Sequence, residues 1–200
     1  MISQFENKGM IYVKLHFLLM LPLLMLFASA GSALAEKPAA FIPPLPGENM
    51  SLEKDMGLLL NETWYPILTD FHALYVALGE PASLNAAPSC VFVGEDKEYV
   101  YEGLTAFTNP VGEQDIWFEM QLTNNTYATS RGIRVGDTLE MLKNAYGDRC
   151  YWEGDTILTY SVSAIEGDYA SPCIMFEIVD DVIASIDIYY PTNVTAPAAP

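Results

Sequence analysis

The pattern that most constrains the fold is a strand, turn and helix at residues 129–148. Ile133 and Val135 predict a short strand, and Gly136 predicts the turn that follows it. Asp137 can accept a hydrogen bond from the first turn of a helix, and Glu140 can complete a capping box. The apolar residues then share one helical face, and a glycine follows where a helix ends: Leu139, Leu142, Ala145, Tyr146 and Gly147.

A similar unit precedes this one by 68 residues, because residues 69–80 align with residues 137–148. The same shift brings the alternating residues of 118–122 onto those of 186–190. A helix and a later strand that share one offset indicate a tandem duplication. We therefore expect an α+β fold of two tandem repeats, each a helix packed on an antiparallel β-sheet, at residues 51–128 and 129–191. The alternative is two unrelated helix–strand units.

Strands are expected wherever apolar and β-branched residues cluster or alternate between turn signals. Asp180 and Asp181 predict a tight hairpin between the last two strands. The expected strands are residues 56–60, 64–68, 90–93, 98–107, 116–122, 157–162, 173–179 and 182–190.

The N-terminus has the features of an export signal. Lys14 precedes the apolar run 15–30, and Ala33-Leu34-Ala35 has the small residues of a cleavage site. We expect residues 1–35 to be a signal peptide cleaved after Ala35, giving a secreted, extracytoplasmic protein with no membrane span. The alternative is a retained anchor. Residues 36–50 predict a Pro-rich linker and residues 192–200 a disordered tail.

Removal of residues 1–35 leaves seven Lys and Arg (nine less Lys8 and Lys14) and 25 Asp and Glu (26 less Glu6). The net charge of the remaining chain is therefore about −18. Nucleic acids and anionic membrane surfaces require clustered cations, so we expect neither as a partner.

The remaining chemistry-bearing residues are few. Cys90, Cys150 and Cys173 include no Cys-x-x-Cys spacing, and His72 is the one histidine after residue 35. Cys150 and Cys173 are the first choice for a disulfide, although the sequence does not fix the pairing. We expect no catalytic residue, no metal site and no cofactor.

Strand alternation predicts a surface for a binding partner. If Phe118, Met120 and Leu122 face a helix, then the residues between them and their counterparts in the last strand lie on the opposite face. The candidate partner-binding residues are Trp117, Glu119, Gln121, Asp187 and Tyr189. The alternative is that these rings are covered by helices or by the other repeat.

The sequence resembles the β-lactamase-inhibitor-protein-like fold. The resemblance rests on the expected order of a helix followed by antiparallel strands, used twice, and on Gly-Ile-Arg-Val-Gly-Asp-Thr-Leu-Glu-Met-Leu at residues 132–142. Leu-Gly-Glu-Pro at residues 78–81, and the Pro-Ser-Cys-x-Phe-x-Gly-x-Asp-Lys-x-Tyr-x-Tyr run at 88–101, are similar to exported proteins of Gram-positive bacteria. The resemblance implies the tandem α+β fold but assigns no function, because this fold hosts inhibitors and assembly factors alike.

The expected function is non-enzymatic binding of an extracytoplasmic protein or peptide. One alternative is a structural or assembly factor of the cell envelope, and another is a hydrolase. The hydrolase would require a deep pocket with a perturbed acid or base. The oligomeric state is left open.

Overall fold

The computed structural model describes residues 41–192, so the predicted signal peptide and all but the first residue of the predicted tail lie outside the described residues. The helices are short: α1 (Leu52–Asp55), α2 (His72–Leu78) and α3 (Leu139–Tyr146). The strands are β1 (Gly57–Leu60), β2 (Thr63–Pro66), β3 (Ser83–Pro88), β4 (Glu95–Tyr101), β5 (Leu104–Val111), β6 (Gln114–Leu122), β7 (Tyr151–Glu153), β8 (Ile157–Ser161), β9 (Cys173–Val179) and β10 (Val182–Tyr189).

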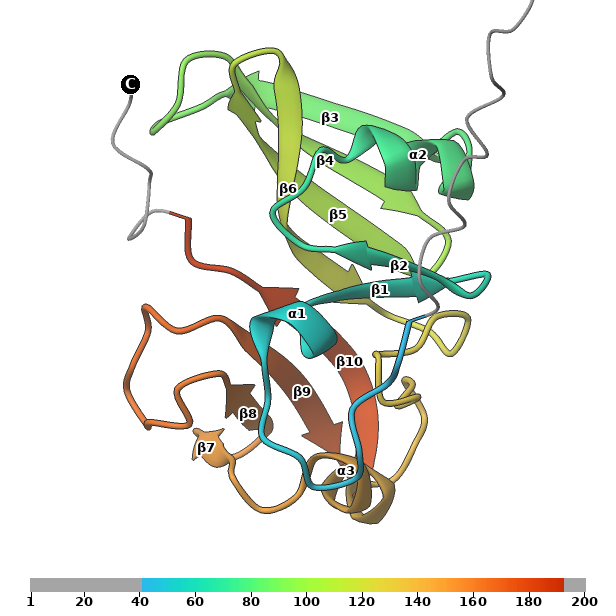
Figure 1. The fold of residues 1–200 in the computed structure, drawn as a ribbon, viewed down its shortest axis with the longest axis vertical. Coiled ribbons are helices and arrows are strands. Elements are labelled where there is room, and N and C mark those ends of the chain that lie inside the picture. The colour runs from blue at the N-terminus through green and yellow to red at the C-terminus, as the bar shows by residue number, and fades with distance from the viewer. Residues whose placement is uncertain (1–40, 193–200) are drawn as a thin grey trace, which may run out of the picture. The chain divides into compact units, whose positions relative to one another are not determined.

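Eight of the strands form one antiparallel sheet in the order β3-β4-β5-β6-β10-β9-β8-β7, and β1 and β2 form a separate hairpin (Figure 1). Strands β6 and β10 join the two halves of the sheet, with Ile186 opposite Leu122 and Ile188 opposite Met120.

The expected fold of two helix-on-sheet repeats is therefore wrong. Strands hold 41% of the described residues and helices 12%. The physical reason is the β6–β10 pairing, which merges the strands of both expected repeats into one large sheet. The sequence pattern marked the strands but not their long-range partners.

Two local predictions also need correction. The apolar run at residues 90–93 is a loop, whereas Ser83–Pro88, which was not expected, is the edge strand β3. All six residues of β3 are exposed, so the strand has no buried side to produce an alternating pattern. Residues 129–135 contain turns and no strand.

The hairpin at Asp180 and Asp181 is confirmed. The two residues separate β9 from β10 and have φ angles of 51° and 60°. Positive φ at both central positions is the requirement of a type I′ hairpin turn, and aspartate tolerates that conformation better than most residues.

Helix α3 begins one residue later than the sequence predicts. Thr138 is the N-cap, and its hydroxyl accepts a hydrogen bond from the Met141 N–H at 3.2 Å. The Asp137 carboxylate instead accepts a bond from the Arg134 N–H at 2.8 Å, within the preceding turn. Asp137 therefore holds the turn and Thr138 caps the helix.

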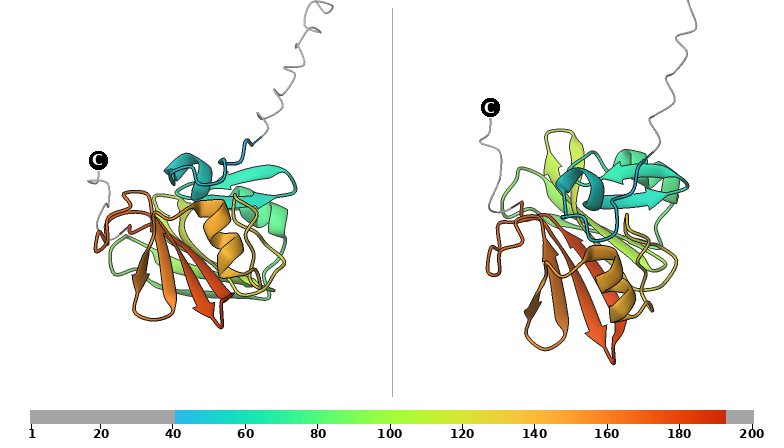
Figure 2. Two further views of the ribbon diagram at one scale, coloured as in Figure 1. Left: turned by 90° about the horizontal axis from the view of Figure 1, so that it is seen from below. Right: turned by 60° about the horizontal axis from the view of Figure 1, so that its bottom comes forward.

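The helices and the β1–β2 hairpin cover one face of the sheet, as the left view of Figure 2 shows. Phe71 at the start of α2 packs on Tyr99 of β4, with ring centroids 4.5 Å apart. Tyr146 of α3 contacts Tyr160 at 5.0 Å and Phe176 at 5.5 Å. These aromatic residues belong to the hydrophobic core of the domain.

Residues 41–50, which belong to the predicted linker, pack against the domain. Phe41 stacks on Trp64 with centroids 4.4 Å apart, and Pro44 is buried. The Gly47 N–H donates to the Ala145 carbonyl at 3.1 Å. This segment is thereby attached to both the β1–β2 hairpin and α3.

Candidate functional site

No helix in residues 41–192 covers the second face of the eight-stranded sheet (Figure 2). We call this surface the open face and define it by strand register. At its centre, Glu119 lies opposite Tyr189 and Gln121 lies opposite Asp187. Four of the five predicted partner-binding residues therefore come together. Their neighbours on the adjacent strands are Thr105, Phe107, Cys173 and Met175.

The fifth predicted residue, Trp117, lies on the covered face, which corrects the prediction. Its side chain is 0% exposed, and its indole N–H donates to the Thr69 hydroxyl at 3.2 Å. A β-bulge explains the difference: Phe107 pairs with Glu119 while Thr108 pairs with Trp117. The extra residue, Phe118, reverses the alternation of side chains along β6.

Phe118 occupies the open face instead of Trp117. Its ring meets the ring of Tyr189 edge to face, with centroids 6.4 Å apart and planes at 70°. Both side chains are half-buried. The available sequence signal for this exchange was the run Ile116-Trp117-Phe118, because three consecutive apolar residues cannot follow strict alternation.

The open face carries carboxylates and no cation. Lys97 is the one basic residue in the eight strands, and it lies on the covered face, where it pairs with Asp115 at 2.7 Å. The other ion pairs of residues 41–192 join Lys54 to Glu48 and Arg131 to Asp55, away from this sheet. The carboxylates that register places on the open face are Asp96, Glu98, Glu119, Glu153, Glu177 and Asp187.

Four of these six carboxylates accept a hydrogen bond from a neutral side chain at 2.9–3.0 Å. The donors to Glu98, Glu119, Glu153 and Glu177 are Asn85, Gln121, Thr159 and Ser185 respectively. Asp96 and Asp187 differ, because the Oδ1 of each is buried and has no hydrogen-bond partner. A buried polar atom without a partner costs free energy, which makes Asp96 and Asp187 the least satisfied acids of the open face, and Asp187 is the one on the central strand β10.

The surroundings of Asp187 change its acidity. Burial, followed by the charge of Glu119, raises the pKa of Asp187 to about 7, and a hydrogen bond from Gln121 opposes this only in part. Burial likewise raises the pKa of Glu119 above its usual value. The two acids thus share a desolvated site in which ionisation of one disfavours ionisation of the other.

The three cysteines are free, so the expected Cys150–Cys173 disulfide is absent. Cys173 belongs to the open face, whereas Cys150 packs against the core on the covered side of the sheet. The sheet therefore separates the two sulfur atoms. Burial raises the pKa of Cys173 to about 12, so its side chain is a neutral thiol at pH 7 and a poor nucleophile.

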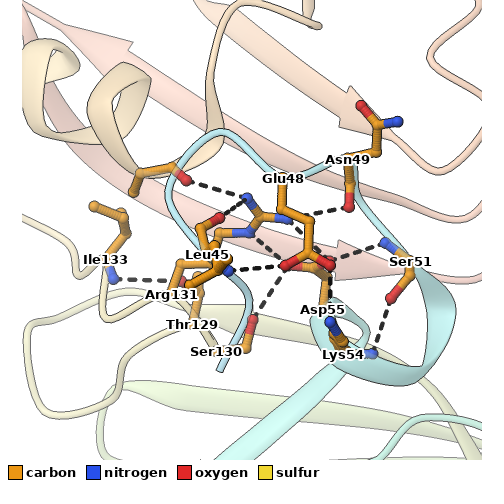
Figure 3. A network of polar contacts seen from close by, with 11 residues as sticks. Leu45, Glu48, Asn49, Ser51, Lys54, Asp55, Thr129, Ser130, Arg131 and Ile133 are labelled. Carbon is orange, nitrogen blue, oxygen red and sulfur yellow. Dashed lines mark hydrogen bonds and ion pairs between the residues drawn. The ribbon is translucent and has the colours of Figure 1, made fainter. Parts of the chain in front are cut away.

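A second polar cluster surrounds Arg131 (Figure 3). Its guanidinium donates two hydrogen bonds to the Asp55 carboxylate, at 2.7 and 3.2 Å, and also donates to the carbonyls of Ala145 and Leu45. Asp55 also accepts bonds from Ser51 and Ser130. Because protein groups already satisfy both charges, this cluster is structural: it joins residues 41–55 to α3. No local sequence pattern indicates the Arg131–Asp55 pair, because its two residues are 76 positions apart.

A groove of about 710 Å³ lies beside this cluster, lined by residues 43–44, 59–61, 126–132 and 134. Its two cations are already engaged, because Arg131 binds Asp55 and Arg134 donates to the carbonyls of Asn125 and Thr126 at 2.9 Å. The groove offers a ligand no free charge. The open face is therefore the better candidate site.

No protein-family model, curated protein or solved structure matches the chain. The resemblance to β-lactamase-inhibitor-like proteins therefore has no support from them. Within residues 41–192, no three His, Cys, Asp or Glu side chains are grouped as metal ligands. No helix in that part of the chain has the length and apolar character needed to span a membrane.

Proposed function

We propose that this protein is an exported, non-enzymatic binding module that holds a protein or peptide partner on its open face. The observation that carries the proposal is the combination of half-buried aromatic rings and uncompensated carboxylates on an uncovered sheet. Phe107, Phe118 and Tyr189 supply the rings, and Glu119 and Asp187 supply the central charges.

Each component has a role in association. Aromatic rings dominate the energetics of protein interfaces because they bury large areas at low entropic cost. The carboxylates require a partner that carries positive charge, since a chain with a net charge near −17 attracts a basic surface at long range. The partner is therefore a protein segment that combines basic and apolar side chains.

The geometry favours binding over hydrolysis. Asp187 has the raised pKa that an acid catalyst needs, but it lies on an open sheet face. The thiol of Cys173 beside it is neutral at pH 7. An extended surface of this kind suits a macromolecular partner better than a small substrate, which requires enclosure.

Affinity capture tests the proposal. The mature domain is immobilised and exposed to the extracytoplasmic proteins of the cells that produce it, and recovery is quantified by mass spectrometry. The variants Phe118→Ser and Tyr189→Ser alter the open face. Met141→Ser alters an exposed apolar residue of α3 and is the matched control.

We expect at least one protein whose recovery falls tenfold or more with both open-face variants and is unchanged with Met141→Ser. Circular dichroism confirms that each variant is folded. Equal recovery of every captured protein by all four baits would overturn the proposal.

A further inference from the structure

We propose that Glu119 and Asp187 form a receptor for one basic side chain, an ammonium or guanidinium, presented by the partner that docks on the open face. This inference rests on the proposed function and names the chemical group that the site recognises. The two acids lie on adjacent central strands, β6 and β10, so an incoming side chain can reach both at once.

The arrangement of neighbours favours a long basic side chain. Tyr189 is the cross-strand partner of Glu119, and Phe118 contacts Tyr189 through its ring. Met175 is the cross-strand partner of Asp187 on the other side. Lysine and arginine carry an apolar stem below a charged head, so these rings and the thioether can pack against the stem while the carboxylates bind the head.

The site has an acceptor that no donor of residues 41–192 satisfies. Glu119 already accepts one bond from Gln121, but Asp187 Oδ1 is buried without a donor. No Lys or Arg of the eight strands lies on the open face. Residues 41–192 thus leave this central acid pair without a cation, and a partner's cation would supply the missing hydrogen bond and neutralise the pair.

Binding of the cation is coupled to the release of a proton from Asp187. The titratable groups that face Asp187 are Glu119 on β6, Tyr189 on β10 and Cys173 on β9. Tyrosine and the thiol are neutral at pH 7, and the raised pKa of Asp187 keeps it partly protonated near that pH. A bound ammonium favours the carboxylate, so Asp187 loses its proton to solvent as the ion pair forms.

A random dodecapeptide display library is the probe for the receptor. The full mature domain selects peptides, and selection on a Phe118→Ser, Tyr189→Ser double variant gives the background. We expect the specific peptides to be enriched in Lys or Arg flanked by apolar residues. Recovery of no peptide above background, or of specific peptides without excess Lys or Arg, would overturn the receptor.

The strongest selected peptide is then measured with Glu119→Gln, Asp187→Asn and Glu140→Gln. The last removes one negative charge from exposed α3 and is the matched control. We expect the first two to weaken binding at least tenfold and Glu140→Gln to change it less than twofold. Equal effects of all three would mean that net charge, and not this acid pair, recruits the peptide.

Calorimetry in buffers of different ionisation enthalpy gives the number of protons released. Near pH 6 we expect a net release of up to one proton by the native chain and a clearly smaller release by Asp187→Asn. An identical release by both chains would contradict the linkage. If capture finds a partner that depends on the open face while specific peptides lack basic residues, the receptor fails and the proposed function stands.

Discussion

Trp117 and Phe118 are adjacent in the chain and lie on opposite faces of the sheet. Each lies on the face that strict alternation assigns to the other. Trp117 is buried and bonded to Thr69, whereas Phe118 meets Tyr189 on the open face. One extra residue in β6 produces this exchange, and it determines which ring stabilises the core and which ring is available to a partner.

This arrangement predicts different costs for the two truncations. Trp117→Ala should lower the free energy of unfolding by about 3–5 kcal/mol, because it empties a filled core site. Phe118→Ala should cost less than half as much, since the ring is half-exposed. Urea denaturation of both variants measures this. Equal losses would place Phe118 in the core as well.

We predict that the buried residues Arg131 and Asp55 are strongly coupled in their effects on stability. Arg131→Met should destabilise the domain by about 3–5 kcal/mol, because Asp55 is 0% exposed and would keep an uncompensated charge. The double variant Arg131→Met, Asp55→Leu should recover part of that loss. Chemical denaturation of the full double-mutant cycle gives the coupling, and strictly additive losses would contradict it.

We predict that Thr138→Ala lowers the free energy of unfolding by about 0.5–2 kcal/mol, because the Thr138 hydroxyl caps α3. Asp137→Ala should cost less, since its carboxylate bonds an exposed turn. Thermal or urea unfolding distinguishes them. A larger loss for Asp137→Ala would restore the capping box that the sequence favoured.

Asp187 predicts a specific dependence of stability on pH. Its pKa is raised from 3.8 to about 7 in the folded protein, so the native state binds this proton more tightly than the unfolded state does. The resulting stabilisation is complete below about pH 4 and is lost as the pH rises through 7. The raised pKa of Glu119 acts in the same direction.

Asp187→Asn isolates this effect, because asparagine resembles the neutral acid. The variant should match the native chain near pH 4 and become more stable than it by a few kcal/mol, in order of magnitude, near pH 8. Urea denaturation at both pH values provides the comparison. A difference that does not change with pH would show that Asp187 titrates normally.

Local sequence patterns predicted the features that depend on neighbouring residues. The Asp180–Asp181 hairpin is an example, because two residues that tolerate positive φ separate two apolar strands. The grouping of Glu119, Gln121, Asp187 and Tyr189 was also predictable, since period-two alternation assigns them to one face.

Features that depend on distant contacts were not predictable in this way. The Arg131–Asp55 pair spans 76 positions, and neither residue has a local pattern that identifies its partner. The bulge at Phe118 depends on how β5 pairs with β6. The pairing of β6 with β10 decides whether the strands form two sheets or one, and their alternation is compatible with either outcome.

The most direct test of the open-face account is photo-crosslinking in the cells that produce the protein. A photoreactive phenylalanine analogue replaces Tyr189 in one chain and Met141 in another. We predict a crosslinked product with a second protein at position 189 and none at position 141, on the exposed side of α3. A product at position 141 alone, or none at position 189, would contradict it.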